Sequence, residues 1–274
     1  MSVATINRAM AFAEQFGLKI PVLMAPMAGA CPVALAAAVT DAGGMGALGA
    51  LLHKPAQIEA WVREFRATGA RPLQINLWIP DPAPPRDASR EAEVAAFLSQ
   101  WGPAVDPAAC AAEPIDFEAQ CEALLAARPT AVSSIMGLYP DAFVARLKEA
   151  GIAWFACVTT VQEARAAAHA GADVIVAQGA EAGGHRGAFV AADADQQASG
   201  LFALLPQVVD AVRVPVVATG GIADARGIAA ALTLGASAVQ IGTGLLRCPE
   251  AAITSAWADA LGRTEPDHTR LTRA

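Results

Sequence analysis

The sequence has few charged or aromatic residues, and it lacks the features of several protein classes. Charged residues make up 16% and aromatic residues 5% of its 274 positions. The formal net charge of −7 argues against nucleic-acid binding, because affinity for phosphate backbones comes from a basic face. No apolar run reaches the ~20 residues of a membrane span, and the start MSVATINRAMAFAEQFG lacks the basic and apolar parts of a secretory signal. We therefore expect a cytoplasmic protein with no nucleic-acid or membrane partner.

Ligand clusters and paired thiols are also missing. The five cysteines are scattered without a CxxC pair, which indicates reduced thiols rather than a disulfide framework or a zinc site: Cys31, Cys110, Cys121, Cys157 and Cys248. No second histidine or carboxylate lies at metal-ligand spacing, so no metal site is expected. No GxGxxG follows the first apolar run, which argues against a Rossmann dinucleotide site.

Apolar residues are abundant at 55%, and they fall into short runs. These runs lack strict alternation, as is typical of parallel strands buried on both faces. Eight strands are predicted: Ile20–Met24, Met45–Leu51, Leu73–Ile79, Ala131–Ile135, Ile152–Val158, Asp173–Ala177, Val214–Ala218 and Ser237–Ile241.

Alanine-rich amphipathic stretches separate the runs. Eight helices are predicted: Pro32–Asp41, Pro55–Ala67, Asp116–Ala127, Asp141–Ala150, Val161–Ala170, Leu201–Ala211, Asp224–Leu234 and Glu250–Leu261. Gly151, Gly171 and Gly235 are expected to end helices in the left-handed conformation. Asp141 and Asp224 are predicted N-caps.

Eight strand–helix pairs predict an α/β fold, a (β/α)8 TIM barrel, forming one domain over residues 1–274. The segment Pro80–Pro114 departs from the alternation, because it is proline-rich and contains one helix-like patch, Arg90–Gln100. We interpret it as an excursion after the third strand. Two alternatives remain open for it: a part of the substrate site, or a solvent-exposed insertion without a role.

Glycine pairs follow the last two predicted strands. The stretch ATGGIAD contains Gly220 and Gly221, and QIGTG contains Gly242. Glycine allows backbone N–H groups to approach an anion, and the following helix adds a favourable dipole. Because loops after strands seven and eight commonly bind phosphate in this fold, we expect a phosphate site there.

The loop QGAEAGGHRG after the sixth strand is rich in glycine and contains His185. Imidazole titrates near neutrality and suits general-base work or hydrogen bonding to a developing anion, although a structural loop histidine is the alternative. For Glu181 we favour acceptance of backbone N–H bonds over catalysis. Arg186 either attracts an anionic substrate or is solvated, and solvation is the commoner outcome.

Together these motifs resemble one known family. PVLMAPMAG, AVTDAGGMGALGA, QINLW, QGAEAGGHRG and ATGGIADARGIAAALTLGASAVQIGTGLL are similar to those of the nitronate monooxygenases, formerly 2-nitropropane dioxygenases, and closest to the bacterial class I branch. The resemblance implies a TIM barrel that binds FMN without a covalent bond. It also implies oxidation of alkyl nitronates by O2 to a carbonyl compound and nitrite, with the histidine acting as base on neutral nitroalkanes.

The resemblance further implies the site residues. His185 matches the catalytic histidine, and the implied FMN-binding residues are Ala25, Pro26, Met27, Asn76, Gln178, Gly183, Gly220, Gly221, Gln240, Ile241, Gly242 and Thr243. Family members continue with an FSGR-like segment and a terminal helix where this sequence reaches HTRLTRA, so either the sequence is short or that segment has been lost. If the segment covers the flavin in the family, its loss would weaken flavin retention. A lysine that some relatives carry after strand five is replaced by the stretch CVTT, which favours the nitronate branch.

Two other functions remain open from the sequence. One is an NAD(P)H-dependent flavin reductase of the quinone or enoyl-acyl-carrier-protein type on the same scaffold. The other is a barrel that binds a phosphorylated ligand without redox chemistry. The sequence leaves the oligomeric state and the physiological substrate undetermined.

Overall fold

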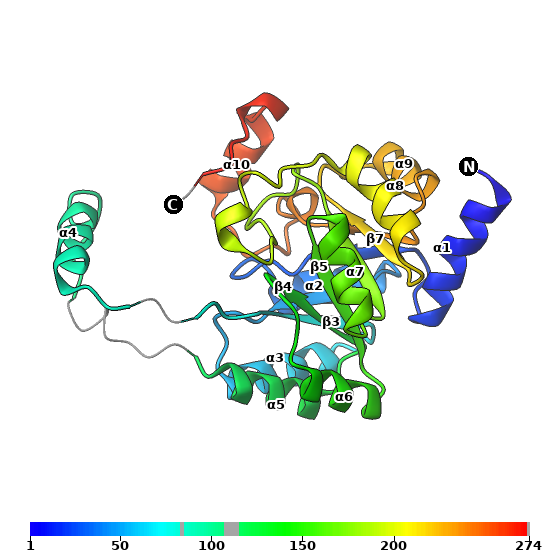
Figure 1. The fold of residues 1–274 in the computed structure, drawn as a ribbon, viewed down its shortest axis with the longest axis horizontal. Coiled ribbons are helices and arrows are strands. Elements are labelled where there is room, and N and C mark those ends of the chain that lie inside the picture. The colour runs from blue at the N-terminus through cyan, green and yellow to red at the C-terminus, as the bar shows by residue number, and fades with distance from the viewer. Residues whose placement is uncertain (83–84, 107–114, 273–274) are drawn as a thin grey trace.

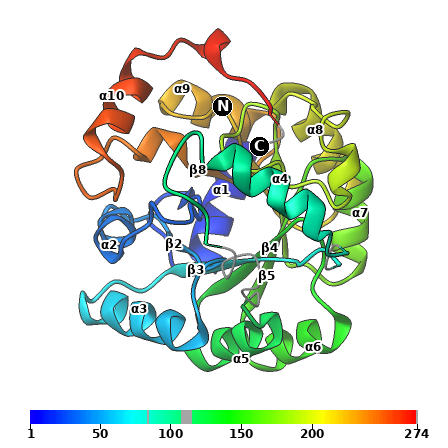
Figure 2. The same cartoon turned by 90° about the vertical axis from the view of Figure 1, so that its left-hand side faces the viewer.

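Eight short parallel strands form the centre of the fold in the computed structural model, which describes residues 1–82, 85–106 and 115–272 (Figures 1 and 2). They pair in the order β1-β8-β7-β6-β5-β4-β3-β2. A parallel bridge between Leu23 and Met45 joins the two end strands and closes the barrel. The bounds are β1 Val22–Met24, β2 Gly46–Gly49, β3 Leu73–Trp78, β4 Ala131–Ile135, β5 Ala153–Val158, β6 Val174–Gln178, β7 Val216–Thr219 and β8 Ala238–Ile241.

The predicted strands are all present, and nearly every strand residue is buried, as expected for strands covered on both faces. Helices surround the strands in Figure 2. They are α2 Val33–Asp41, α3 Pro55–Ala67, α5 Phe117–Ala127, α6 Asp141–Glu149, α7 Val161–His169, α8 Leu201–Ala211, α9 Ala225–Thr233 and α10 Ser255–Arg263. Short 3-10 turns lie at Ala191–Asp193, Thr243–Leu245 and Pro266–His268.

Most predicted helix ends are confirmed. Asp224 caps α9 by accepting hydrogen bonds from the N–H groups of Arg226 and Gly227. The glycines after α6, α7 and α9 have φ angles of 68°, 97° and 113°, in the left-handed region that glycine adopts without penalty.

One predicted N-cap and one predicted helix start are wrong. Asp141 is the first helical residue of α6, because Pro140 with its extended backbone holds the N-cap position. Helix α10 begins at Ser255 rather than at Glu250, because the Thr254 side chain accepts a hydrogen bond from Trp257 N and starts the helix there.

Helix α1 (Val3–Gln15), which the sequence analysis did not predict, closes the amino-terminal end of the barrel. Ser2 caps it, and Ala9, Phe12 and Ala13 are buried on one of its faces. The ring of Phe16, just after the helix, lies edge-on to Phe155 inside the barrel, with centroids 5.1 Å apart. In Figure 1, α1 lies on one side of the strands.

Helix α4 (Ala88–Leu98) lies in the connection between β3 and α5 and has no buried residue. Figure 1 places it apart from the barrel on the side away from α1, and in Figure 2 it crosses in front of the strands. The proline-rich excursion predicted around it lies partly outside the described residues, at 83–84 and 107–114.

Within the described part of the chain, no helix is long and apolar enough to cross a membrane. Four of the five cysteines are free thiols: Cys31, Cys121, Cys157 and Cys248. Cys110 lies outside the described residues.

Candidate active site at the carboxyl ends of the strands

The residues predicted to form a site lie on or just after five strands, at their carboxyl ends. Ala25, Pro26 and Met27 follow β1, Asn76 lies on β3, Gln178 ends β6, and Gln240 and Ile241 end β8, while Gly183, His185, Gly220, Gly221, Gly242 and Thr243 lie in the loops that follow β6, β7 and β8. Because the strands are parallel, these positions converge on one end of the barrel.

The loops after β1 and β8 contact each other directly. Ala25 N donates a hydrogen bond to Ile241 O over 2.8 Å. A Cβ atom at Gly242 would lie 3.3 Å from the Cβ of Ala25 and 3.6 Å from the Sδ of Met27. Gln240 is buried, and its Oε1 accepts a hydrogen bond from the Nε2 of Gln74 over 3.0 Å. Its amide is therefore tied into the barrel interior.

Glycines of the loops after β6, β7 and β8 form a crowded cradle. Gly220 and Gly221 have φ angles of 120° and 65°, which disfavour other residues. A Cβ atom at Gly183 would lie 2.8 Å from the Oγ1 of Thr243. Among the described residues, no hydrogen bond engages the backbone N–H groups of Gly221 and Gly242. These two donors suit an anion, as the sequence predicted for this position.

The side-chain amide of Asn76 is hydrogen-bonded through its nitrogen, which leaves its oxygen available to a ligand. Its Nδ2 donates to the Oγ and the backbone O of Ser133, over 3.1 and 3.2 Å. No hydrogen bond to its Oδ1 occurs in the described part of the chain. The Oδ1 is therefore suited to accept a hydrogen bond from a ligand N–H.

Gln178 clamps the backbone on both sides of the His185 ring. Its Nε2 donates to His185 O over 3.0 Å, and its Oε1 accepts from Gly187 N over 2.8 Å. The side chain is almost fully buried. The side chain of Gln178 therefore holds the glycine-rich loop by its backbone at His185 and Gly187.

Arg186 also holds the loop, which differs from both alternatives considered for it. Its Nη1 donates to Gln178 O over 2.9 Å, and its Nη2 donates to Gln197 O over 2.5 Å. Partial burial lowers the pKa of the guanidinium, while the negative charge of Glu163 opposes that change. The cation holds both ends of the loop through backbone carbonyls and is partly buried rather than fully solvated.

Glu181 has the role that the sequence favoured for it. Its Oε1 and Oε2 both accept from Leu201 N, over 3.0 and 2.9 Å. Leu201 is the first residue of α8, where a carboxylate is also stabilised by the helix dipole. Glu181 therefore connects the start of the loop to its end.

Glu163 is a support residue that sequence reasoning missed. This buried carboxylate accepts from Thr159 N over 2.6 Å, from Thr160 N over 3.1 Å, and across to Phe189 N over 2.7 Å. It joins the loop after β5 to the loop that carries His185. The capping-box pattern Thr160-x-x-Glu163 was the available signal, and it predicts only the local bonds.

We predict that Glu163→Ala loosens the loop after β6, because one buried and two partly buried N–H groups lose their acceptor. The loss costs ~1–3 kcal/mol for a buried group and less for a partly buried one. Limited proteolysis should cut faster between residues 183 and 197, and the free energy of unfolding should fall. Glu149→Ala, at the exposed end of α6, is the matched control. Equal proteolysis of the two variants would contradict the assignment.

Trp78 is the second residue missed, although it ends the motif QINLW. It is the last residue of β3, and its ring lies 4.4 Å from the His185 ring, centroid to centroid, at 64°. His185 itself is exposed, and no side-chain hydrogen bond of its ring occurs among the described residues. The indole is therefore the observed restraint on the orientation of the imidazole.

This geometry defines an α/β barrel whose candidate site lies at the carboxyl ends of the strands, where enzymes with this fold place their active sites. A sequence model described as nitronate monooxygenase matches residues 10–274, and the chain belongs to that family. Enzymes of this family use O2 to oxidise nitronates, which are small-molecule substrates, to carbonyl compounds and nitrite. The family is generally flavin-dependent. This chain is therefore a nitronate monooxygenase enzyme.

Individual relatives agree with the family. The nitronate monooxygenase of Pseudomonas aeruginosa is 39% identical over 95% of this chain and 76% of its own length. The one from Paraburkholderia phytofirmans is 41% identical over 89% and 68%. The crystal structure of nitroalkane oxidase from Streptomyces ansochromogenes is similar with a TM-score of 0.80 and 35% identity, covering 91% of this chain and 72% of that one. FabK from Thermotoga maritima is similar with a TM-score of 0.72 and 28% identity, covering 93% and 68%.

Proposed function

We propose that the chain binds FMN at the carboxyl ends of its strands and uses it to oxidise alkyl nitronates with O2. The observation that carries this proposal is the glycine cradle of Gly183, Gly220, Gly221 and Gly242, which keeps side chains out of a place where backbone donors are open. Such a cradle fits a phosphoryl group. Membership of a generally flavin-dependent family indicates that the cofactor is a flavin. The cradle favours FMN in particular, because the phosphate of FMN would accept hydrogen bonds from the open backbone donors of the cradle.

The predicted flavin-binding residues divide into three groups according to the part of FMN that each would contact. Gly220, Gly221, Gly242 and Thr243 would hold the phosphate, and Gln240 and Ile241 would shape the wall beneath it. The backbone of Ala25, Pro26 and Met27 and the Oδ1 of Asn76 would border the ring system. Gln178 and Gly183 would shape the loop above it.

When bound, FMN would supply the electron transfer between nitronate and O2. The chain's own task is to place the substrate and to handle the proton. His185 would remove the α-proton of a neutral nitroalkane or donate a hydrogen bond to an anionic nitronate. Trp78 restricts the ring, and Gln178 fixes the backbone beneath it, so the imidazole is oriented before substrate arrives.

Residues 1–274 would then form one FMN-binding domain, in which 80–114 is an insertion. Helix α4, its described helix, lies on the side of the barrel away from α1, which is the side of the His185 loop. Helix α4 is therefore placed where it could influence access to the site.

An absorption spectrum followed by anaerobic titration tests the function. Protein incubated with FMN should retain yellow absorbance after desalting. An alkyl nitronate should bleach it without O2, whereas NADH should leave it unchanged. Rapid bleaching by NADH would support the reductase alternative, and failure to gain any flavin absorbance would support the non-redox alternative.

We predict that Gly221→Ala weakens FMN binding at least ~10-fold, because the new methyl group would lie 3.1 Å from the Cβ of Glu181 and displace the cradle. Gly151→Ala is the matched control. Its φ of 68° is close to the 65° of Gly221, so backbone strain is shared, but its Cβ position is open and distant from the site. Fluorescence titration with FMN measures both affinities. Similar losses in the two variants would count against the assigned cradle.

A further inference from the structure

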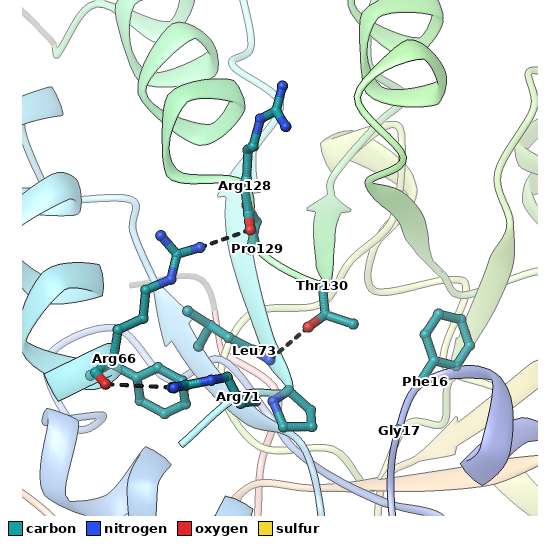
Figure 3. Close-up of a pocket in the computed structure, with 10 residues that line it drawn as sticks. Phe16, Gly17, Arg66, Arg71, Leu73, Arg128, Pro129 and Thr130 are labelled. Carbon is teal, nitrogen blue, oxygen red and sulfur yellow. Dashed lines mark hydrogen bonds between the residues drawn. The ribbon is translucent and has the colours of Figure 1, made fainter. Parts of the chain in front are cut away.

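A cavity of about 360 Å³ lies at the amino-terminal end of the barrel, away from the His185 loop (Figure 3). Leu73 begins β3, and Thr130 precedes β4, so both lie at the strand ends opposite to the candidate active site. The other walls come from the ends of α1, α3 and α5. The lining residues are Phe16, Gly17, Phe65, Arg66, Arg71, Pro72, Leu73, Arg128, Pro129 and Thr130.

The lining contains three arginines and no acidic residue, in a chain whose net charge is −7. Within the described part of the chain, none of the three forms an ion pair with a carboxylate, although Arg86, Arg146 and Arg226 do. This wall is therefore a local concentration of positive charge without an internal counter-ion.

Two of the guanidinium groups are held in place by backbone carbonyls. Arg66 uses its Nη2 to contact Ala127 O over 2.6 Å and Arg128 O over 2.9 Å. Arg71 uses its Nη1 to contact Ala70 O over 2.8 Å. The bond of Arg66 to Ala127 O offsets the negative end of α5, and the Nη1 of Arg71 also donates to Arg66 O at the end of α3, over 3.5 Å. The hydrogen bonds use one nitrogen of each guanidinium group, Nη2 of Arg66 and Nη1 of Arg71. The other N–H groups of the two side chains are therefore available to donate to a ligand, and their positions are already restricted.

The rest of the wall combines a hydroxyl group with apolar surface. Thr130 Oγ1 accepts a hydrogen bond from Leu73 N over 3.2 Å, which leaves its own O–H free to donate. The rings of Phe16 and Phe65 also line the cavity. The cavity therefore suits a ligand with an anionic head group beside an apolar body.

Arg128 gives a second, independent observation. It ends α5 in the left-handed conformation, with φ 46°. The corresponding residues after α3, α6, α7 and α9 are glycines with positive φ: Gly69, Gly151, Gly171 and Gly235. An arginine there costs conformational energy that glycine would avoid. Its exposed side chain extends away from Arg66 in Figure 3, so contact with a ligand in the cavity would require the side chain to rotate.

We propose that this cavity binds a small organic oxyanion, a phosphate or carboxylate attached to an apolar body, through Arg66, Arg71 and the swinging Arg128. The planar guanidinium fork matches both head groups. The site is separate from the proposed flavin site and does not depend on it.

Isothermal titration of the full chain, without FMN and again with one equivalent of FMN, tests the proposal. A stoichiometric amount of FMN would occupy the proposed flavin site and leave the cavity free for the probe, so binding that is equal in both titrations belongs to the cavity. Phenyl phosphate and benzoate are the probes, and their relative affinities identify the preferred head group. We expect one saturable site, weakened as salt rises. Arg71→Ala should weaken binding ~10-fold, as expected for one charge-assisted hydrogen bond, and Arg63→Ala, one turn from Arg66 but outside the lining, should not.

Arg128→Gly separates ligand binding from structural support. It should lower the affinity for the probe about 3-fold or more, because one positive charge is removed. It should also raise the melting temperature of the protein by ~2–4 °C, because backbone strain is relieved. If Arg128 does not contact the ligand, the same substitution gives the stability gain with unchanged probe affinity. That result, or the absence of saturable binding by either probe to the unaltered chain, would overturn the proposal.

Discussion

Replacing His185 by asparagine is expected to lower turnover of a neutral nitroalkane by ~10²–10⁴, the usual contribution of a general base. With a preformed nitronate the proton is already gone, and the ring acts only as a hydrogen-bond donor. The expected loss is then ~10², the contribution of one donor to a developing or bound anion. The comparison of the two substrates therefore separates the two roles of the imidazole.

The structure indicates that this substitution leaves the loop intact. The loop is held through the backbone O of His185 by Gln178, and the ring makes no hydrogen bond among the described residues. Asparagine thus removes the titratable group without removing a support. The flavin absorption spectrum is expected to stay close to that of the parent.

Steady-state nitrite production measures the loss, with His169→Asn on the exposed face of α7 as the matched control. Trp78→Leu is the companion variant, because it frees the ring and keeps the imidazole. It should lower kcat less than His185→Asn does. Parent-like turnover of both substrates by His185→Asn would remove the residue from the mechanism.

The barrel was predictable from the sequence because its evidence is local. Each strand is a short apolar run, and several helices are followed by glycines whose positive φ the structure confirms, such as Gly171 and Gly235. The cap at Asp224 was equally local. Asp141 was misplaced by one position, because the sequence does not distinguish an aspartate that caps from one in the first turn behind Pro140.

The supports of the candidate site were less predictable because their partners are distant in the chain. The hydrogen bond from Phe189 N to Glu163 joins helix α7 to the loop after β6, and the contact of Trp78 with His185 joins β3 to the same loop. Arg186 carries a charge, which suggested a surface or substrate role, yet its partners are backbone carbonyls that no side-chain pattern reveals. Sequence located the loops, whereas the three-dimensional contacts show how they are held.

Helix α1 was missed for a related reason. Its apolar spacing of Ala9, Phe12, Ala13 and Phe16 suits a helix, but no strand precedes it, so the strand–helix alternation gave it no place. Only the structure shows that it covers the open amino-terminal end of the barrel.

Phe155→Ala tests the importance of that cover and is expected to lower the free energy of unfolding by ~3–5 kcal/mol. Phe155 is fully buried inside the barrel, and its ring contacts those of Phe12 and Phe16, with centroids 6.5 and 5.1 Å away. Removing it leaves a cavity between α1 and the strands that the closed barrel cannot collapse to fill.

Urea denaturation compares this variant with Phe202→Ala, the same substitution at a side chain that is 74% exposed on α8. The control should change stability by less than ~0.5 kcal/mol. Because Phe155 lies at the end of the barrel opposite the glycine cradle, flavin affinity of the folded variant should remain near that of the parent. Equal stability of the two variants would show that α1 contributes little to closing the barrel, and a parallel loss of flavin affinity would show that the two ends of the barrel are coupled.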